Sequence, residues 1–151
     1  MKILIVGCGR IGSTLARLLS AHHDVTVVDR TSEAFRRLGP DFHGHRLVGP
    51  GTDRDILVRA GIESADAFVS VTDGDNRNIM AAQIAKRVFK VPMVMTRIYD
   101  PSRAAVFQKM DIHVLNTTSL AAGYFRDIVE ARTPAGFGEQ IQAYLDAVQE
   151  A

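Results

Sequence analysis

The chain has 151 residues, a length that fits one domain and can bury a hydrophobic core without disulfide bonds or structural metal ions. Its 46% hydrophobic and 23% charged residues exclude a disordered chain, and the formal net charge of +1 gives no global field to attract nucleic acid or an anionic membrane. The single cysteine, Cys8, excludes an internal disulfide, and no apolar run approaches the roughly 20 residues of a membrane span, so we expect a soluble protein without direct membrane insertion.

Short apolar runs alternate with helical patterns along the first half of the chain. β-branched residues are frequent in the runs, and the intervening segments repeat apolar residues at helical spacing. The predicted strands are 2–6, 24–29 and 45–48, and the predicted helices are 11–19, 31–38 and 53–60.

The same alternation continues in the second half. The predicted strands are 67–72, 93–98 and 112–115, and the predicted helices are 75–89, 101–110, 120–131 and 140–149. Six strands interleaved with helices predict an α/β fold, a Rossmann-type doubly wound parallel sheet with strand order 3-2-1-4-5-6. We expect one Rossmann domain over residues 1–135 and an extra C-terminal helix in residues 136–151, after the break at 133–138 (TPAGFG).

The last predicted helix is amphipathic, with its apolar side chains on one face. Two interpretations stay open for this face, a surface for dimerisation and ordinary packing against the domain's own sheet. The face consists of Ile141, Tyr144, Leu145 and Val148.

A glycine-rich turn follows the first predicted strand. Residues 7–12 (GCGRIG) match G-x-G-x-x-G, and Asp29 ends the next strand 22 positions beyond Gly7. Gly7 permits the tight turn, Gly9 lets a pyrophosphate approach the backbone, and Gly12 lets the helix pack closely, while the amides of the opening helix face the phosphates. We expect Asp29 to bind the adenosine ribose, which favours NAD, although the neighbouring Arg30 leaves NADP open.

Further candidates lie beside the turn and at the ends of other strands. Arg10 pairs with phosphate oxygens or is a solvated residue at the helix start. The segment 49–53 is placed to wrap the adenine, and the segment 72–76 lies across the topological switch. For Asp73 and Asp75, helix capping competes with ligand contact. Arg97 points into the cleft or pairs with an acid such as Asp100.

Five segments in order resemble a known family. MKILIVGCGRIGSTLARLL, VTVVDR, the Gly-x-Gly-Thr-Asp turn, VTDGDNRNIMAAQIAKR and RIYDP are similar to the TrkA N-terminal domain, also called the KTN or RCK N-terminal domain. This is the NAD-binding regulatory fold of Trk and Ktr potassium-uptake systems. The resemblance covers residues 1 to about 131.

The resemblance implies a regulatory subunit that binds NAD(H) or ATP/ADP and gates a membrane potassium transporter or channel subunit. It implies a cytoplasmic protein, peripheral to the inner face of the membrane through that partner. It also implies self-association as a dimer or ring, or pairing with a related Trk regulatory subunit. The ligand-binding residues are then Gly7, Gly9, Arg10, Ile11, Gly12, Asp29, Arg30, Gly51, Thr52, Asp53, Thr72, Asp73, Asn76 and Arg97.

Two departures from the family pattern are visible. Gly49-Pro50-Gly51 replaces the usual Gly-Asp-Ala before Thr-Asp, so the segment predicted to contact the adenine differs from that of the family. Only one predicted helix follows Gly138, so we expect no RCK C-terminal lobe, which is the part that binds second ligands in several members of the family.

Two other function classes compete with that of a regulatory subunit. A small NAD(P)-dependent oxidoreductase needs a substrate region and a proton-transfer residue near the nicotinamide. Four of the five histidines fall on the adenosine half and His113 begins a strand, so we expect a protein that is not an enzyme. A redox-sensing Rossmann module unrelated to potassium would use Cys8, which we expect to be a small buried filler facing the sheet.

Overall fold

In the computed structural model, which describes residues 1–130, six strands form one parallel sheet. The strand order is β3-β2-β1-β4-β5-β6, which confirms the predicted fold class and topology. The strands are β1 (Lys2–Val6), β2 (Asp24–Asp29), β3 (His45–Val48), β4 (Ala67–Ser70), β5 (Met93–Arg97) and β6 (His113–Leu115).

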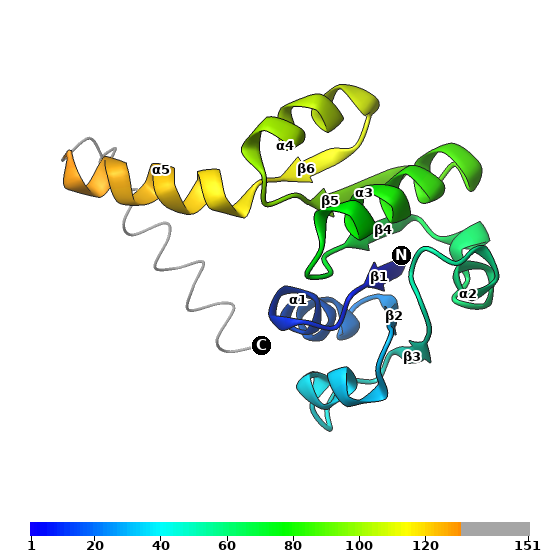
Figure 1. Ribbon diagram of the computed structural model, residues 1–151. Coiled ribbons are helices and arrows are strands. Elements are labelled where there is room, and N and C mark those ends of the chain that lie inside the picture. Colours follow the sequence, from blue (N-terminus) through cyan, green and yellow to red (C-terminus); the bar gives the residue numbers. More distant parts are fainter. Residues whose placement is uncertain (131–151) are drawn as a thin grey trace.

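Helical segments connect the strands and cover both faces of the sheet (Figure 1). Those with regular α-helical geometry are α1 (Arg10–Ser20), α2 (Arg54–Arg59), α3 (Asp75–Gln83), α4 (Pro101–Phe107) and α5 (Thr117–Val129). Four short segments differ from them: the 3₁₀ helices η1 (Ser32–Leu38), η2 (Ile62–Ser64) and η4 (Gln108–Met110), and the π-helical turn η3 (Ile84–Val88).

The alternation of side chains along the central strands builds two cores. Leu4 and Val6 of β1 point to a core shared with α2, α3 and η3. Ile3 and Ile5 point to the opposite core, which α1 and η1 cover. Because both faces of β1 are buried, the strand is apolar at nearly every position, as expected for a parallel sheet covered on both sides.

Four predicted helices differ in detail from those observed. The segment 101–110 is α-helical as far as Phe107 and ends in the 3₁₀ helix η4. The segment 31–38 is a 3₁₀ helix, a winding common in short connectors, and the segment 75–89 is regular only as far as Gln83, after which it widens into η3. The helix expected from residue 120 begins at Thr117, because the Asn116 side chain caps it by accepting a hydrogen bond from the amide of Ser119 at 2.6 Å. The expected break at 133–138 and helix over 140–149 lie outside the described residues.

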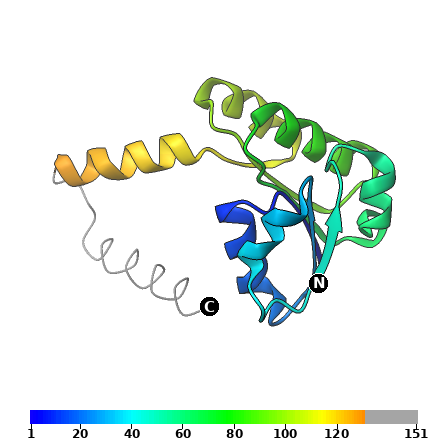
Figure 2. The same cartoon turned by 60° about the horizontal axis from the view of Figure 1, so that its bottom comes forward.

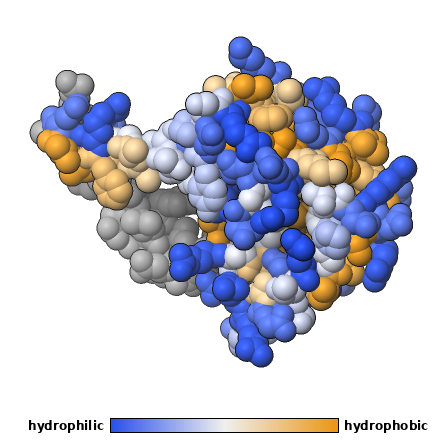
Figure 3. All heavy atoms as spheres, in the orientation of Figure 1, coloured by the Kyte–Doolittle hydropathy of each residue, from blue (hydrophilic) through white to orange (hydrophobic). Residues whose placement is uncertain are grey.

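Helix α5 extends away from the sheet and its covering helices (Figures 1 and 2). None of its residues is buried, and its exposed apolar side chains are visible on this arm in Figure 3. Leu120, Phe125 and Val129 are 63%, 65% and 85% exposed. Across residues 1–130, no helix is both long enough and apolar enough to cross a membrane.

The start of α1 packs so closely on the glycine turn that only glycine fits at position 12. A Cβ atom added to Gly12 would lie 1.8 Å from the carbonyl oxygen of Gly7. We predict that Gly12→Ala lowers the free energy of unfolding by about 3 kcal/mol, because the helix must shift off the sheet. Gly123→Ala on α5 is the matched control, since a Cβ there meets nothing within 4 Å. Urea denaturation measures both, and equal stability of the two variants would contradict the prediction.

Candidate functional site

A cleft of about 1150 Å³ opens at the carboxyl ends of the strands, where the strand order reverses between β1 and β4. Open α/β sheets bind ligands at such a switch point. Eleven of the fourteen predicted site residues line it: Gly7, Gly9, Arg10, Ile11, Asp29, Arg30, Gly51, Thr52, Thr72, Asp73 and Arg97. A smaller hollow of about 430 Å³ lies toward the amino ends of the strands and contains none of them.

Backbone amides at the start of α1 face this cleft without a cap. Gly9 is the N-cap residue, so no side chain caps the helix, and the first turn holds no acidic residue. The amides of Arg10, Ile11 and Gly12 therefore lack acceptors within the helix. A Cβ on Gly9 would meet nothing within 4 Å, so the backbone is open to an approaching group. A helix start of this kind attracts anions.

Gly7 and Gly51 are glycines because other chain segments press against them. Gly7 has φ +105°, and a Cβ on it would lie 2.8 Å from the amide nitrogen of Thr72. A Cβ on Gly51 would lie 2.1 Å from Cγ1 of Val6. These contacts draw the ends of β1 and β4 and the loop after β3 together around one cleft. Gly51, which belongs to the Gly-Pro-Gly departure from the family pattern, thus lies directly against the Val6 side chain of β1.

Asp29 is fixed above the glycine turn by two sets of donors. Its Oδ2 accepts a hydrogen bond from the amide of Cys8 at 2.7 Å, and its Oδ1 accepts from the amide of Thr31 at 3.1 Å. Each carboxylate oxygen has two lone pairs, so acceptor capacity remains for hydroxyl groups of a ligand. The bond to Cys8 joins the end of β2 to the turn, and the sequence pattern did not predict it.

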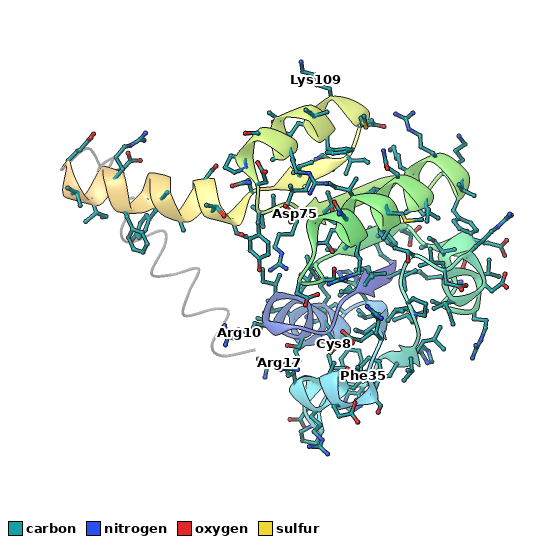
Figure 4. The ribbon with its side chains drawn as sticks, in the orientation of Figure 1. Cys8, Arg10, Arg17, Phe35, Asp75 and Lys109 are labelled. Atoms are coloured by element: carbon teal, nitrogen blue, oxygen red, sulfur yellow. The ribbon has the colours of Figure 1, made fainter. Side chains whose placement is uncertain are left out.

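The Cys8 side chain is fully buried in the core between the sheet and α1, as expected for a small filler (Figure 4). Burial, together with the nearby Asp29 carboxylate, raises the pKa of this thiol to about 11. The thiol is therefore protonated at neutral pH and poorly suited to react with oxidants.

Three arginines on the cleft wall have guanidinium groups without protein partners. Arg10, Arg30 and Arg37 form no side-chain hydrogen bond or ion pair with any other residue in the range 1–130. Figure 4 shows the side chain of Arg10 extending outward from α1. Arg37, on η1, was not among the predicted residues, because its helical register is visible only once η1 is placed. Within residues 1–130, the cleft therefore presents unpaired positive charge in the half formed by the ends of β1, β2 and β3.

The opposite wall consists of Thr72, Arg97, Tyr99 and the first residue of α5, Thr117. Arg97 is only 7% exposed, donates a hydrogen bond to the carbonyl of Thr72, and lies 4.0 Å from the centre of the Tyr99 ring. Its Nε is buried and has no hydrogen-bond partner in the described structure. The alternative pairing of Arg97 with Asp100 is wrong, because the Asp100 carboxylate instead caps α4.

Gly12, Asp53 and Asn76, of the predicted site residues, lie outside the cleft lining. Gly12 is buried under the first turn of α1. The Asp53 carboxylate caps α2 by accepting from the amides of Asp55 and Ile56, and the Asn76 side chain accepts a hydrogen bond from Arg103 at 2.7 Å. Their positions in the sequence predicted that all three line the cleft. In the structure Gly12 is buried, and the polar side chains of Asp53 and Asn76 bond to neighbouring groups instead.

Asp73 and Asp75, for which helix capping and ligand contact were the two alternatives, have different bonding partners in the structure. Asp73 lines the cleft but pairs with Arg77, which lowers the pKa of its carboxyl group. Asp75 accepts hydrogen bonds from the amides of Tyr99 and Asp100, at 2.9 and 3.1 Å, and so holds the loop after β5. Neither acid caps α3, whose N-cap is Gly74.

The doubly wound sheet, the open glycine turn and the acid at the end of β2 together define a Rossmann-type nucleotide-binding fold. Residues 3–117 match the TrkA-N domain family model, and the chain belongs to that family. The match confirms the resemblance found in the sequence.

Curated relatives carry the names of potassium uptake proteins. The Trk system potassium uptake protein TrkA of Streptomyces coelicolor is 50% identical over 123 residues, covering 81% of this chain and 55% of that protein. A TrkA homolog of Pyrococcus abyssi is 36% identical over 138 residues, covering 85% and 60%. The chain thus spans less than two thirds of the length of either relative.

Solved structures share the fold at lower identity. The Kef CTD of Shewanella denitrificans in its AMP-bound form superposes with a TM-score of 0.74 at 18% identity, covering 99% of this chain and 97% of that one. The GsuK RCK domain superposes with a TM-score of 0.72 at 22% identity, covering 91% and 30%.

The raised pKa of Cys8 gives a test of its burial. We predict that the thiol of the folded protein ionises with a midpoint of about 11, against its ordinary value of 9.0, as measured from thiolate absorbance at 240 nm with Cys8→Ser as the baseline. Because folding raises the pKa of the thiol, the protonated thiol contributes to the free energy of unfolding. This contribution is complete below pH 9 and is lost as the pH rises towards 11. A folded-state midpoint at or below 9 would contradict this placement of the thiol.

Proposed function

We propose that the cleft binds an adenine nucleotide, NAD(H) or ATP/ADP, and that the chain is a regulatory nucleotide-binding part of a potassium uptake system rather than an enzyme. One observation carries the proposal. The same open cleft is lined by the uncapped start of α1, by the fixed carboxylate of Asp29 and by guanidinium groups that have no partner among the described residues.

The phosphates of the ligand occupy the mouth of α1 in this proposal. The amides of Arg10 and Ile11 donate to phosphate oxygens, and the absent side chain of Gly9 leaves room for them. The guanidinium of Arg10 then reaches the outer phosphates, where two parallel hydrogen bonds are possible.

The adenosine occupies the half of the cleft formed by the ends of β1, β2 and β3. Asp29 accepts hydrogen bonds from the ribose hydroxyls, and Gly51 and Thr52 lie at the base. A carboxylate repels a 2′-phosphate, which favours NAD over NADP, while Arg30 and Arg37 at the rim counter part of that repulsion.

The part of the ligand beyond the first phosphates meets the opposite wall. Thr72, Arg97 and Tyr99 offer it a hydroxyl, a buried cation and an aromatic ring. NAD and ATP differ in what they present there, so the two ligands make different contacts with this wall. A ligand shifts a conformational equilibrium only through such a difference in affinity for the two states.

No histidine in the described range lines the cleft, which supports ligand binding rather than proton transfer. The names of the relatives support a membrane potassium transporter or channel subunit as the partner, with this chain on the cytoplasmic side. The exposed apolar side chains of α5 support self-association or pairing with a related subunit.

The first test is calorimetric titration with NAD, NADH, NADP, ATP, ADP and AMP. We predict that Asp29→Ala weakens NAD, ATP and AMP alike by about tenfold or more, because all three share the ribose and each loses charge-assisted hydrogen bonds. Asp24→Ala, at the opposite end of the same strand, is the matched control and keeps normal affinity. Unchanged binding of all three ligands to the Asp29 variant would refute the ribose assignment.

The second test separates the phosphates. We predict that Arg10→Ala weakens ATP by about ten- to a hundredfold and AMP by only a few fold, because the guanidinium contacts the outer phosphates. Arg17→Ala provides the control, since Arg17 is on the last turn of the same helix and outside the cleft lining. Equal losses for ATP and AMP would remove the assignment of Arg10.

A further inference from the structure

Asn78 on α3 is fully buried and lies directly behind the wall formed by Thr72 and Arg97. Its side chain makes four hydrogen bonds with two residues of that wall. Oδ1 accepts from the amide of Thr72 at 2.8 Å and from its hydroxyl at 2.7 Å. Nδ2 donates to the carbonyl of Thr72 and to the carbonyl of Arg97, both at 3.0 Å.

These bonds use the full capacity of the amide group. An asparagine side chain has two N–H donors and an oxygen that accepts twice, and here every one is satisfied. Aspartate has the same size but lacks the donors, and an apolar residue lacks both kinds of group. The site is therefore specific for asparagine by chemistry as well as by volume.

The carbonyl of Thr72 is the point at which Asn78 and Arg97 meet. It accepts one hydrogen bond from Nδ2 of Asn78 and another from the guanidinium of Arg97. The direction of that carbonyl fixes where the guanidinium lies. Asn78 holds this direction by bonding to both the amide and the carbonyl of Thr72. The second hold, on the carbonyl of Arg97, fixes the backbone from which the same guanidinium extends.

We propose that Asn78 is a positioning residue that sets how the cleft distinguishes its ligands, by holding Thr72 and Arg97 in the geometry that the distal part of the ligand meets. Asn78 does not line the cleft, so it acts only through these two residues. The inference rests on the proposed nucleotide binding and adds to it the residue that sets discrimination between NAD, which reaches this wall, and AMP, which stops short of it.

The test compares NAD and AMP binding to the full chain carrying Asn78→Asp, with Ser70→Ala as the matched control. Ser70 is equally buried and bonds to the carbonyl of Asn78 and to the hydroxyl of Thr96, so its loss also weakens this core. It touches neither Thr72 nor the guanidinium of Arg97 in those bonds. Thermal unfolding of both variants measures the purely structural cost.

We predict that Asn78→Asp weakens NAD by about tenfold or more and AMP by less than about threefold, whereas Ser70→Ala leaves the ratio of the two affinities unchanged. In the Arg97→Ala background, Asn78→Asp changes the ratio by a smaller factor, because only the route through Thr72 then remains. Asn78→Ser, which is smaller and leaves room for a water, gives the same pattern if the aspartate variant does not fold.

An unchanged ratio of NAD to AMP affinity in a folded Asn78 variant would overturn the proposal and leave Asn78 a structural residue. An effect on the ratio that is undiminished in the Arg97→Ala background would also overturn the proposal, which requires Arg97 as well as Thr72. Failure of the unaltered protein to bind either ligand is a different result, because it contradicts the proposed function itself.

Discussion

The close contact between the glycine turn, the start of α1 and the end of β4 is the constraint on which the rest of the structure depends. Gly12 touches the carbonyl of Gly7, and Gly7 in turn lies against the amide of Thr72. A side chain at Gly12 would push α1 away from the glycine turn, and one at Gly7 would push that turn away from the backbone that follows β4. Because the contact is this short, α1 begins at once after β1, and its uncapped amides open into the cleft.

The two walls of the cleft are built differently. The half formed by the ends of β1, β2 and β3 has exposed arginines that pair with no residue of the range 1–130, beside Asp29, whose carboxylate is held by backbone amides. On the opposite wall the polar groups are tied to one another through Asn78 and Asp75. An open, charged wall suits recognition of phosphates and sugar, whereas a rigid wall suits discrimination between ligands that differ beyond them.

The rigid wall is continuous with the start of α5. Nδ2 of Asn116 donates to the carbonyls of Ile98 and Tyr99, and Oδ1 of the same residue caps α5. Tyr99 and Thr117 both line the cleft. Asn116 therefore links this wall of the cleft directly to the start of the helix that extends from the domain (Figure 1).

Sequence patterns were sufficient to predict the sheet and most of the cleft wall formed by the ends of β1, β2 and β3. Strand order follows from the alternation of elements, and Gly7 and Asp29 were identifiable because their roles depend on local spacing. Asn78 and Tyr99 were missed, since their importance comes from contacts between elements far apart in the chain, and Arg37 was missed because its place at the cleft depends on the register of η1. Asp53 and Asn76 were placed in the cleft by sequence position, but nearby backbone and side-chain groups use their polar atoms.

The most direct test of the central claim is a titration of the ¹⁵N-labelled chain with ADP, followed through its backbone amide resonances. The account predicts that the largest shifts, saturating together, belong to Arg10 and Ile11, because their amides gain phosphate acceptors. Shifts centred on the hollow at the amino ends of the strands, near Lys2 and His45, with the α1 amides unmoved, would contradict it.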